Sequence, residues 1–193
     1  MVLSNMGHVA RNQGDLEDAK AYYQRSLNIR REVGDRYGMA ISLNELGAVA
    51  LMEHDLAQSE RYYREALSIR RGLQQPYHLA EDWIGLARLN LAREELETAM
   101  DYAKKAAAYL DVNPTLAGAI DPLRDFRFLW EVLQAVGTAE DADRVLSLAV
   151  GIMEKFLQTN EDPAAREMYL RQPHHALLWS TYERRIRSGM GGS

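Results

Sequence analysis

The sequence contains no cysteine, which excludes disulfide bonds and thiolate metal sites. Prolines are few, and Pro76, Pro114, Pro122 and Pro163 all lie between segments whose apolar residues recur with helical spacing. No stretch alternates apolar and polar residues over the length of a strand. These absences predict an all-α protein.

A basic surface and a long apolar run are also lacking. The net charge of -5 and the isoelectric point near 5.6 argue against general affinity for nucleic acid. No apolar stretch approaches the roughly 20 residues needed to span a bilayer. The first residues show no basic region followed by an apolar run, so we expect no signal peptide in them. We therefore expect a cytoplasmic protein that binds neither nucleic acid nor membranes.

The chain repeats itself at an offset of 40 residues. Segment 3–31 aligns with segment 43–71, and a third copy begins at residue 83. The pairs that match between the first two copies include Leu3/Leu43, Gly7/Gly47, Ala10/Ala50, Asp15/Asp55, Tyr23/Tyr63 and Leu27/Leu67. Agreement over so many positions indicates a duplicated structural unit.

Each unit has the pattern of a helical hairpin. Small side chains at Gly7 and Ala19 would let two helices approach closely, while Tyr23 fills the space beside them. Gly14 can adopt positive φ at the end of the first helix, and Asp15 can cap the second. One hairpin cannot bury its own apolar stripes, so neighbouring hairpins must stack.

This pattern resembles the tetratricopeptide repeat, which places large residues, Leu and Gly on its first helix and Ala, Phe and Ala on its second. The first copy carries it as Leu3, Met6, Gly7, Ala10, Ala19, Tyr23 and Ser26. The offset of 40 residues exceeds the usual period of about 34 residues. In this longer period the sequence is similar to kinesin-light-chain-type repeats. The segment REVGDRYGMA resembles a motif that recurs between the repeats of bacterial multidomain regulators. The resemblance implies a right-handed α–α superhelix of antiparallel helical hairpins with a C-terminal capping helix.

The expected units follow from this alignment. The repeats are 1–40, with a truncated first helix, then 41–80 and 81–113, and a degenerate fourth at 122–157 in which Trp130 takes the place of Gly7. Capping helices are expected at 162–187 and a flexible tail at 188–193. Asp121 and Asp162, each followed by proline, should cap the helices that begin after them.

No catalytic pattern is present. The sequence has no Ser/His/Asp arrangement, phosphate loop or dinucleotide fingerprint. His174 and His175 would point about 100° apart on a helix, and neither has a carboxylate or cysteine four residues away. We interpret them as structural residues rather than metal ligands. We therefore expect no enzymatic activity, no metal and no cofactor.

In arrays of the resembled type, the first helix of each hairpin lines the inner, concave face. The residues predicted to bind a partner there are His8, Arg11, Asn12, Asn44, Leu51, Met52, Ile84, Arg88, Leu91 and Arg127. Apolar residues between arginines suggest a groove for an amphipathic, partly acidic segment. The alternative is that some of the apolar members pack against a neighbouring repeat or the C-terminal helix. The set has Asn44 but no lysine, so it does not match the carboxylate clamp of chaperone-binding repeats.

The predicted function is a non-catalytic interaction module that binds a protein or peptide segment, or another domain of the same protein. The first helix lacks a turn that the second copy has, and the resemblance implies the C-terminal region of a larger bacterial signalling protein. One alternative is a small-molecule or peptide sensor domain of a transcriptional or switch-ATPase regulator. A third interpretation is self-association through the truncated first helix.

Overall fold

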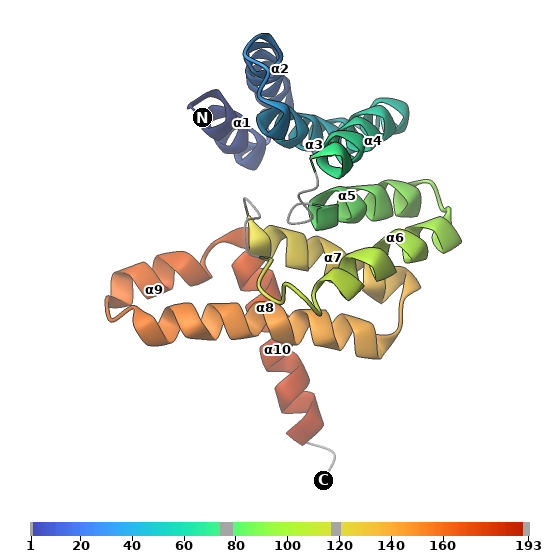
Figure 1. Cartoon of the computed structure of the whole chain (residues 1–193). Coiled ribbons are helices and arrows are strands. Elements are labelled where there is room, and N and C mark those ends of the chain that lie inside the picture. Colours follow the sequence, from blue (N-terminus) through green and yellow to red (C-terminus); the bar gives the residue numbers. More distant parts are fainter. Residues whose placement is uncertain (1, 74–78, 117–120, 191–193) are drawn as a thin grey trace.

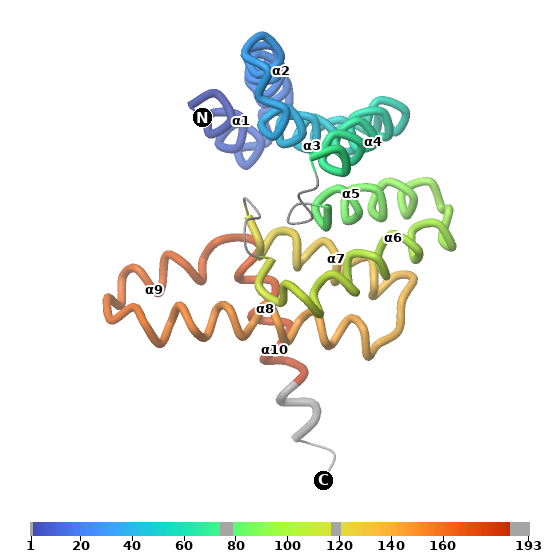
Figure 2. Tube along the Cα trace, in the orientation of Figure 1, coloured from blue at the N-terminus to red at the C-terminus, as the bar shows by residue number. Residues whose placement is uncertain are grey.

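The structure is a computed structural model, and it describes residues 2–73, 79–116 and 121–190. Within these ranges the chain forms α-helices and no strands, which confirms the predicted all-α class. The helices are α1 (Val2–Gln13), α2 (Leu16–Glu32), α3 (Arg36–Met52), α4 (Leu56–Gly72), α5 (Leu79–Ala92), α6 (Leu96–Tyr109), α7 (Pro122–Val136), α8 (Ala139–Thr159), α9 (Pro163–Leu170) and α10 (Pro173–Met190). Successive antiparallel hairpins follow one another from the N-terminal end to the C-terminal end (Figures 1 and 2).

The turn inside each of the first three hairpins uses a residue with positive φ. These residues are Gly14, His54 and Glu94, with φ of 88°, 61° and 62°. The turn geometry predicted for Gly14 is therefore present, and it recurs at the same offset without glycine. The side chain of Asp55 then caps α4 by accepting a hydrogen bond of 3.0 Å from the Gln58 amide.

Two later helices begin with the predicted Asp–Pro starts. The Asp121 carboxylate accepts a hydrogen bond of 3.1 Å from the Arg124 amide at the start of α7. Asp162 accepts one of 3.0 Å from the Ala164 amide at the start of α9. Each proline occupies the first turn, where its missing N–H leaves no helical bond unmade.

Glycines let the helices of the array approach closely. A Cβ atom built at Gly7 would lie 2.5 Å from the Tyr23 ring. The ring of Tyr63 packs between two glycines: a Cβ at Gly47 would meet it at 3.0 Å, and a Cβ at Gly85 would overlap it. Because Gly85 belongs to the following hairpin, this tyrosine joins two consecutive repeats.

The C-terminal helices continue the core of the array. One cluster of buried side chains extends from α5 to Leu178 on α10 and includes Phe126 and Leu129 of α7, all three fully buried. α10 packs against both α7 and α8. It extends to Met190, so the tail expected at 188–193 begins inside a helix, while 191–193 lie outside the described residues. Among the described residues, no helix has the length and apolarity to cross a membrane.

Candidate partner-binding pocket

A pocket of about 530 Å³ opens on the face formed by the first helices of the hairpins. α1, α3, α5 and α7 each contribute side chains to it, and the start of α10 closes one side. Its lining residues are Arg11, Asn12, Ala48, Met52, Arg88, Asp121, Arg124, Arg127, Phe128, Gln172, Pro173, His174 and His175. Four of these are arginines, which makes the pocket predominantly cationic.

Two of the arginines are held from behind by a buried glutamate. Glu45 on α3 is 1% exposed, and its Oε1 lies 3.1 Å from Nη1 of Arg124 on α7. Arg11 on α1 forms an ion pair with the same carboxylate. Burial alone would raise the pKa of Glu45, but Arg124 and Arg11 outweigh it and hold that pKa well below its ordinary value. The ionised glutamate therefore ties the first, second and fourth hairpins together around the pocket.

Arg88 on α5 has a different environment. Its guanidinium carbon lies 3.6 Å from the centroid of the Phe128 ring, the geometry of a cation–π contact. In the described part of the chain, its side chain makes no hydrogen bond or ion pair. Burial lowers the pKa of Arg88 because desolvation disfavours the charged form. A half-buried cation with unused N–H groups at a pocket wall is poised to donate to an anionic group.

The start of α10 adds two histidines. Nδ1 of His174 accepts a hydrogen bond of 3.0 Å from Nη1 of Arg127, whose Nε lies 2.7 Å from Glu131. His175 Nδ1 donates to the Tyr169 carbonyl at 2.8 Å. Both rings are thus engaged by the protein, and in the described residues no group of three His, Cys, Asp or Glu side chains could hold a metal ion.

Replacing His174 with glutamine is expected to reduce the loss of stability on acidification. Burial lowers the pKa of His174 from 6.5 to about 4, so between these values the unfolded chain binds a proton that the folded chain excludes. The free energy of unfolding therefore falls as the pH falls through this range, and a neutral side chain removes that contribution. Urea unfolding at pH 7 and pH 5 measures the effect, and an equal drop in both proteins would contradict it.

The pocket brings together half of the residues predicted to bind a partner. Arg11, Asn12, Met52, Arg88 and Arg127 all line it, although they come from four different helices. Sequence reasoning missed Arg124, Phe128 and the start of α10. The spacing offered a signal for Arg124, which lies one helical turn before Arg127 and shares its face.

The other predicted residues lie elsewhere. Leu51 and Ile84 are 8% and 2% exposed and belong to the core, and Leu91 packs against it. Asn44 is buried and donates a hydrogen bond of 2.8 Å to Asp82. His8 is not among the lining residues of the pocket, and its Nε2 lies 3.4 Å from Glu45. Leu51 and Ile84 therefore pack within the array, which was the alternative to partner binding for the apolar residues of the set. The apolar part of the pocket consists instead of Met52, Ala48 and Phe128.

Comparisons with known proteins agree with this architecture. A family described as tetratricopeptide repeat matches residues 1–72 and 38–111, more than half of the chain. A search of curated proteins found no match. BtubC (BKLC) from P. vanneervenii has a similar structure, with a TM-score of 0.59 and 22% identity over 84% of this chain and 66% of that one.

A putative kinesin light chain from Podosopora anserina, with nearly identical TPR-like repeats, gives a TM-score of 0.58 at 15% identity, covering 98% of this chain and 89% of that one. At these identities the likeness is one of fold. Tetratricopeptide repeats generally form non-enzymatic scaffolds for protein–protein interaction. The repeat pattern, the stacked hairpins and the family match lead to one conclusion: this chain belongs to the tetratricopeptide repeat family.

Proposed function

We propose that this chain is a non-catalytic interaction module whose concave pocket binds an acidic side chain of a partner protein segment. The observation that supports this most is the convergence of four arginines on one pocket. One of them, Arg88, forms a cation–π contact and no ion pair with any described residue. Donation from a guanidinium to a carboxylate gives a short, charge-assisted hydrogen bond. The pocket would thus select the partner by charge.

The remaining charges of the pocket are consistent with this role. Arg11 and Arg124 share one carboxylate, that of Glu45, and Arg127 is paired with Glu131. The lining carboxylate is Asp121, which already caps α7. Arg124 also lies 3.4 Å from Asp125, so Arg88 is the arginine of this pocket that forms no ion pair with a described residue and is available to an incoming carboxylate.

The apolar part of the pocket favours an amphipathic segment. Met52 is 44% exposed, and its flexible thioether side chain adapts to varied apolar partners. Phe128 contributes a ring beside Arg88. A segment with one acidic residue and a neighbouring apolar residue would satisfy both halves of the pocket.

A second candidate is a sensor for a small carboxylate-bearing molecule. The observation in its favour is the position of α10, whose first residues, Pro173, His174 and His175, line one side of the pocket. Helix starts favour anions because their first N–H groups have no partner within the helix. Competition between acetylated glutamate amide and an acidic peptide separates the two, since a sensor would bind the small molecule as tightly as the peptide.

The resemblance to bacterial regulators supports a wider proposal. The array would act in the cytoplasm as the interaction arm of a larger signalling protein, whose own domains could supply the acidic segment. Binding in cis would then regulate the attached domain. Fusing a selected acidic peptide to the chain through a flexible linker would test whether the pocket is filled intramolecularly.

Replacing Arg88 with glutamine is expected to weaken acidic-peptide binding by about 10-fold or more, because hydrogen bonds to charged groups are worth about 1.5–3 kcal/mol. Peptides selected from a random library on the wild-type chain would serve as probes, with affinities measured by fluorescence anisotropy. We expect the selected peptides to be enriched in Asp and Glu.

The matched control is Arg25→Gln on α2, which changes an exposed arginine away from the pocket. It should leave the affinity unchanged. Selected peptides without acidic residues, or equal affinity for the wild-type chain and Arg88→Gln, would overturn the proposal.

A further inference from the structure

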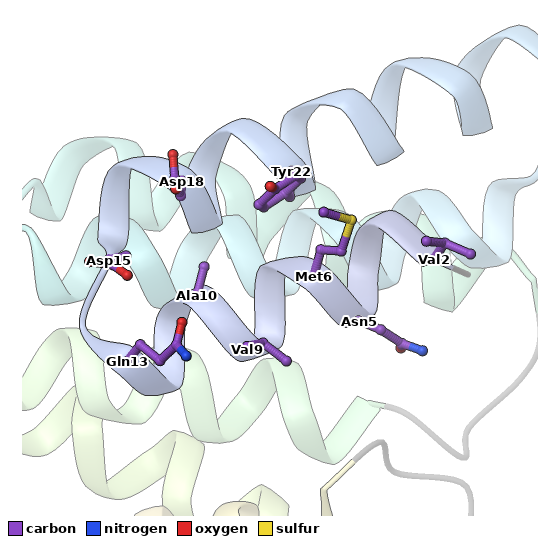
Figure 3. A pocket seen from close by; sticks show the side chains of 9 residues that line it. All are labelled: Val2, Asn5, Met6, Val9, Ala10, Gln13, Asp15, Asp18 and Tyr22. Carbon is purple, nitrogen blue, oxygen red and sulfur yellow. The ribbon is translucent and has the colours of Figure 1, made fainter.

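The outer face of α1 is apolar and uncovered. Val2, Met6 and Val9 are 73%, 40% and 56% exposed, although they follow one another at helical spacing. They border a groove of about 410 Å³ between α1 and α2. Its lining also includes Asn5, Gln13, Asp15, Asp18 and Tyr22. Figure 3 shows Met6 from α1 and Tyr22 from α2 pointing toward one another across this groove.

The equivalent positions in the next two repeats are buried. At an offset of 40 residues, Met6 and Val9 become Leu46 and Val49 of α3, which are 1% and 0% exposed. At twice that offset the corresponding leucines of α5 are also buried. α2 packs on α3 and α4 packs on α5. The second helix of one hairpin therefore covers, in each internal case, the face that is open on α1.

The two covering helices present the same stripe. Its five positions, spaced by four, three, four and three residues, are Leu16, Lys20, Tyr23, Leu27 and Arg30 in α2, and Leu56, Glu60, Tyr63, Leu67 and Arg70 in α4. This spacing keeps all five on one helix face. Within the array, α2 and α4 therefore show which kind of helix covers the face that is open on α1.

The arginine at the last position of the stripe contacts equivalent residues in the α2–α3 and α4–α5 interfaces. Arg30 donates a hydrogen bond of 2.8 Å to the Ser42 hydroxyl, and Arg70 lies 2.8 Å from the Asp82 carboxylate. Ser42 and Asp82 are 40 residues apart and correspond to Val2 on α1. The tyrosine position of α2 also has a counterpart: burial and Glu45 together raise the pKa of Tyr23, and Glu45 corresponds to Asn5 in the groove.

The charged second position of the stripe distinguishes the stripe of α2 from that of α4 as a partner for the groove between α1 and α2. Lys20 lies 2.7 Å from Glu53, and Glu60 lies 2.7 Å from Arg93, so the same site exists with opposite signs. On α1 this site is the neutral Gln13. The groove beside it carries Asp15 and Asp18, and among the described residues no cationic side chain lines it. A lysine, as in α2, is therefore favoured over a glutamate, as in α4.

We propose that the groove between α1 and α2 binds a partner helix that carries the first four positions of the α2 stripe: Leu, Lys, Tyr and Leu at spacings of four, three and four. The fifth position is not required, because its counterpart on α1 is the apolar Val2. The partner continues the stacking seen between α2 and α3. This docking surface is separate from the concave pocket, and neither depends on the other.

A peptide of residues 15–33, stapled into a helix on its exposed side and labelled with a fluorophore, serves as the probe. It should bind the full chain saturably in fluorescence anisotropy. The same peptide with Lys20→Glu should bind at least about 5-fold more weakly, since its carboxylate would face Asp15 and Asp18. Absence of binding, or equal binding of the two peptides, would overturn the proposal.

Variants of the chain locate the site. Met6→Glu should weaken peptide binding at least about 10-fold, because it places a charge in the apolar contact. Met168→Glu on α9, where the methionine is 66% exposed, is the matched control and should bind like wild type. Circular dichroism checks that both variants are folded. Peptide binding that survives Met6→Glu would refute the partner helix. A Met6-dependent dimer that the peptide does not dissociate would also refute it, and would assign the face to another copy of the chain.

Discussion

Replacing Arg124 with methionine is expected to lower the free energy of unfolding by about 3 kcal/mol or more, the range found when one member of a buried ion pair is removed. Arg124 is 5% exposed, and its partner Glu45 is 1% exposed. Without Arg124 the buried carboxylate keeps only Arg11 and the weaker contact to His8. The link between the second and fourth hairpins disappears with it. Urea unfolding followed by circular dichroism measures the change.

The control for this substitution is Arg171→Met on α9. Arg171 also pairs with a glutamate, Glu167, at 2.6 Å, but its side chain is 77% exposed. Exposed pairs of this kind contribute about 0–1 kcal/mol. Comparable losses in the two variants would contradict the assignment of Arg124 and Glu45 as the buried connection across the array.

Replacing Gly85 with leucine should be at least as damaging. A Cβ at this position already overlaps the Tyr63 ring, which is 2% exposed. Inserting side-chain atoms into a packed core typically costs about 1–3 kcal/mol and sometimes more. We expect a loss at the upper end of that range or above, together with separation of the second and third hairpins. Thermal and urea unfolding would both report it.

A second helical glycine provides the control. Gly151 lies on α8, and a Cβ there would have no neighbouring atom within 4 Å. Since glycine is about 1 kcal/mol less favourable than the best helix formers, Gly151→Leu should leave the stability unchanged or raise it. Equal destabilisation by both substitutions would mean that close helix packing at Gly85 is not the cause.

The fold could be predicted because the same residue pattern occurs in several copies at a fixed offset. Matches at a fixed offset located the hairpins, and Gly14 and Asp15 located the first turn. At the same turn position His54 and Glu94 adopt positive φ, which is more common for histidine than for most residues but is not indicated by glutamate. The repeat register, rather than local propensity, identified those turns.

The site could be predicted only in part. The register placed Arg11, Arg88 and Arg127 on the inner face, and all three line the pocket. The burial of Leu51 and Ile84 was not predictable from the register, because α3 packs against α5 and α5 against α7 across that face. Side chains directed between neighbouring first helices are therefore enclosed by the array itself.

The missing parts of the site depend on long-range contacts. Arg124 meets Glu45 across 79 positions of sequence, and the repeat register does not extend reliably into the fourth hairpin. The start of α10 reaches the pocket only because that helix packs back on α7 and α8. No local pattern around His174 indicates where its ring will lie.

Methionine-methyl NMR of the full chain tests the central claim most directly. Met52 lies in the concave pocket and Met6 in the groove on α1, so the two methyl resonances report the two surfaces separately. Titration with a selected acidic peptide should shift the Met52 resonance and leave Met6 unchanged, and Arg88→Gln should need about 10-fold more peptide to reach half of the shift. An unchanged Met52 resonance at saturating peptide, or the same midpoint in Arg88→Gln, would contradict binding of an acidic segment in the arginine pocket.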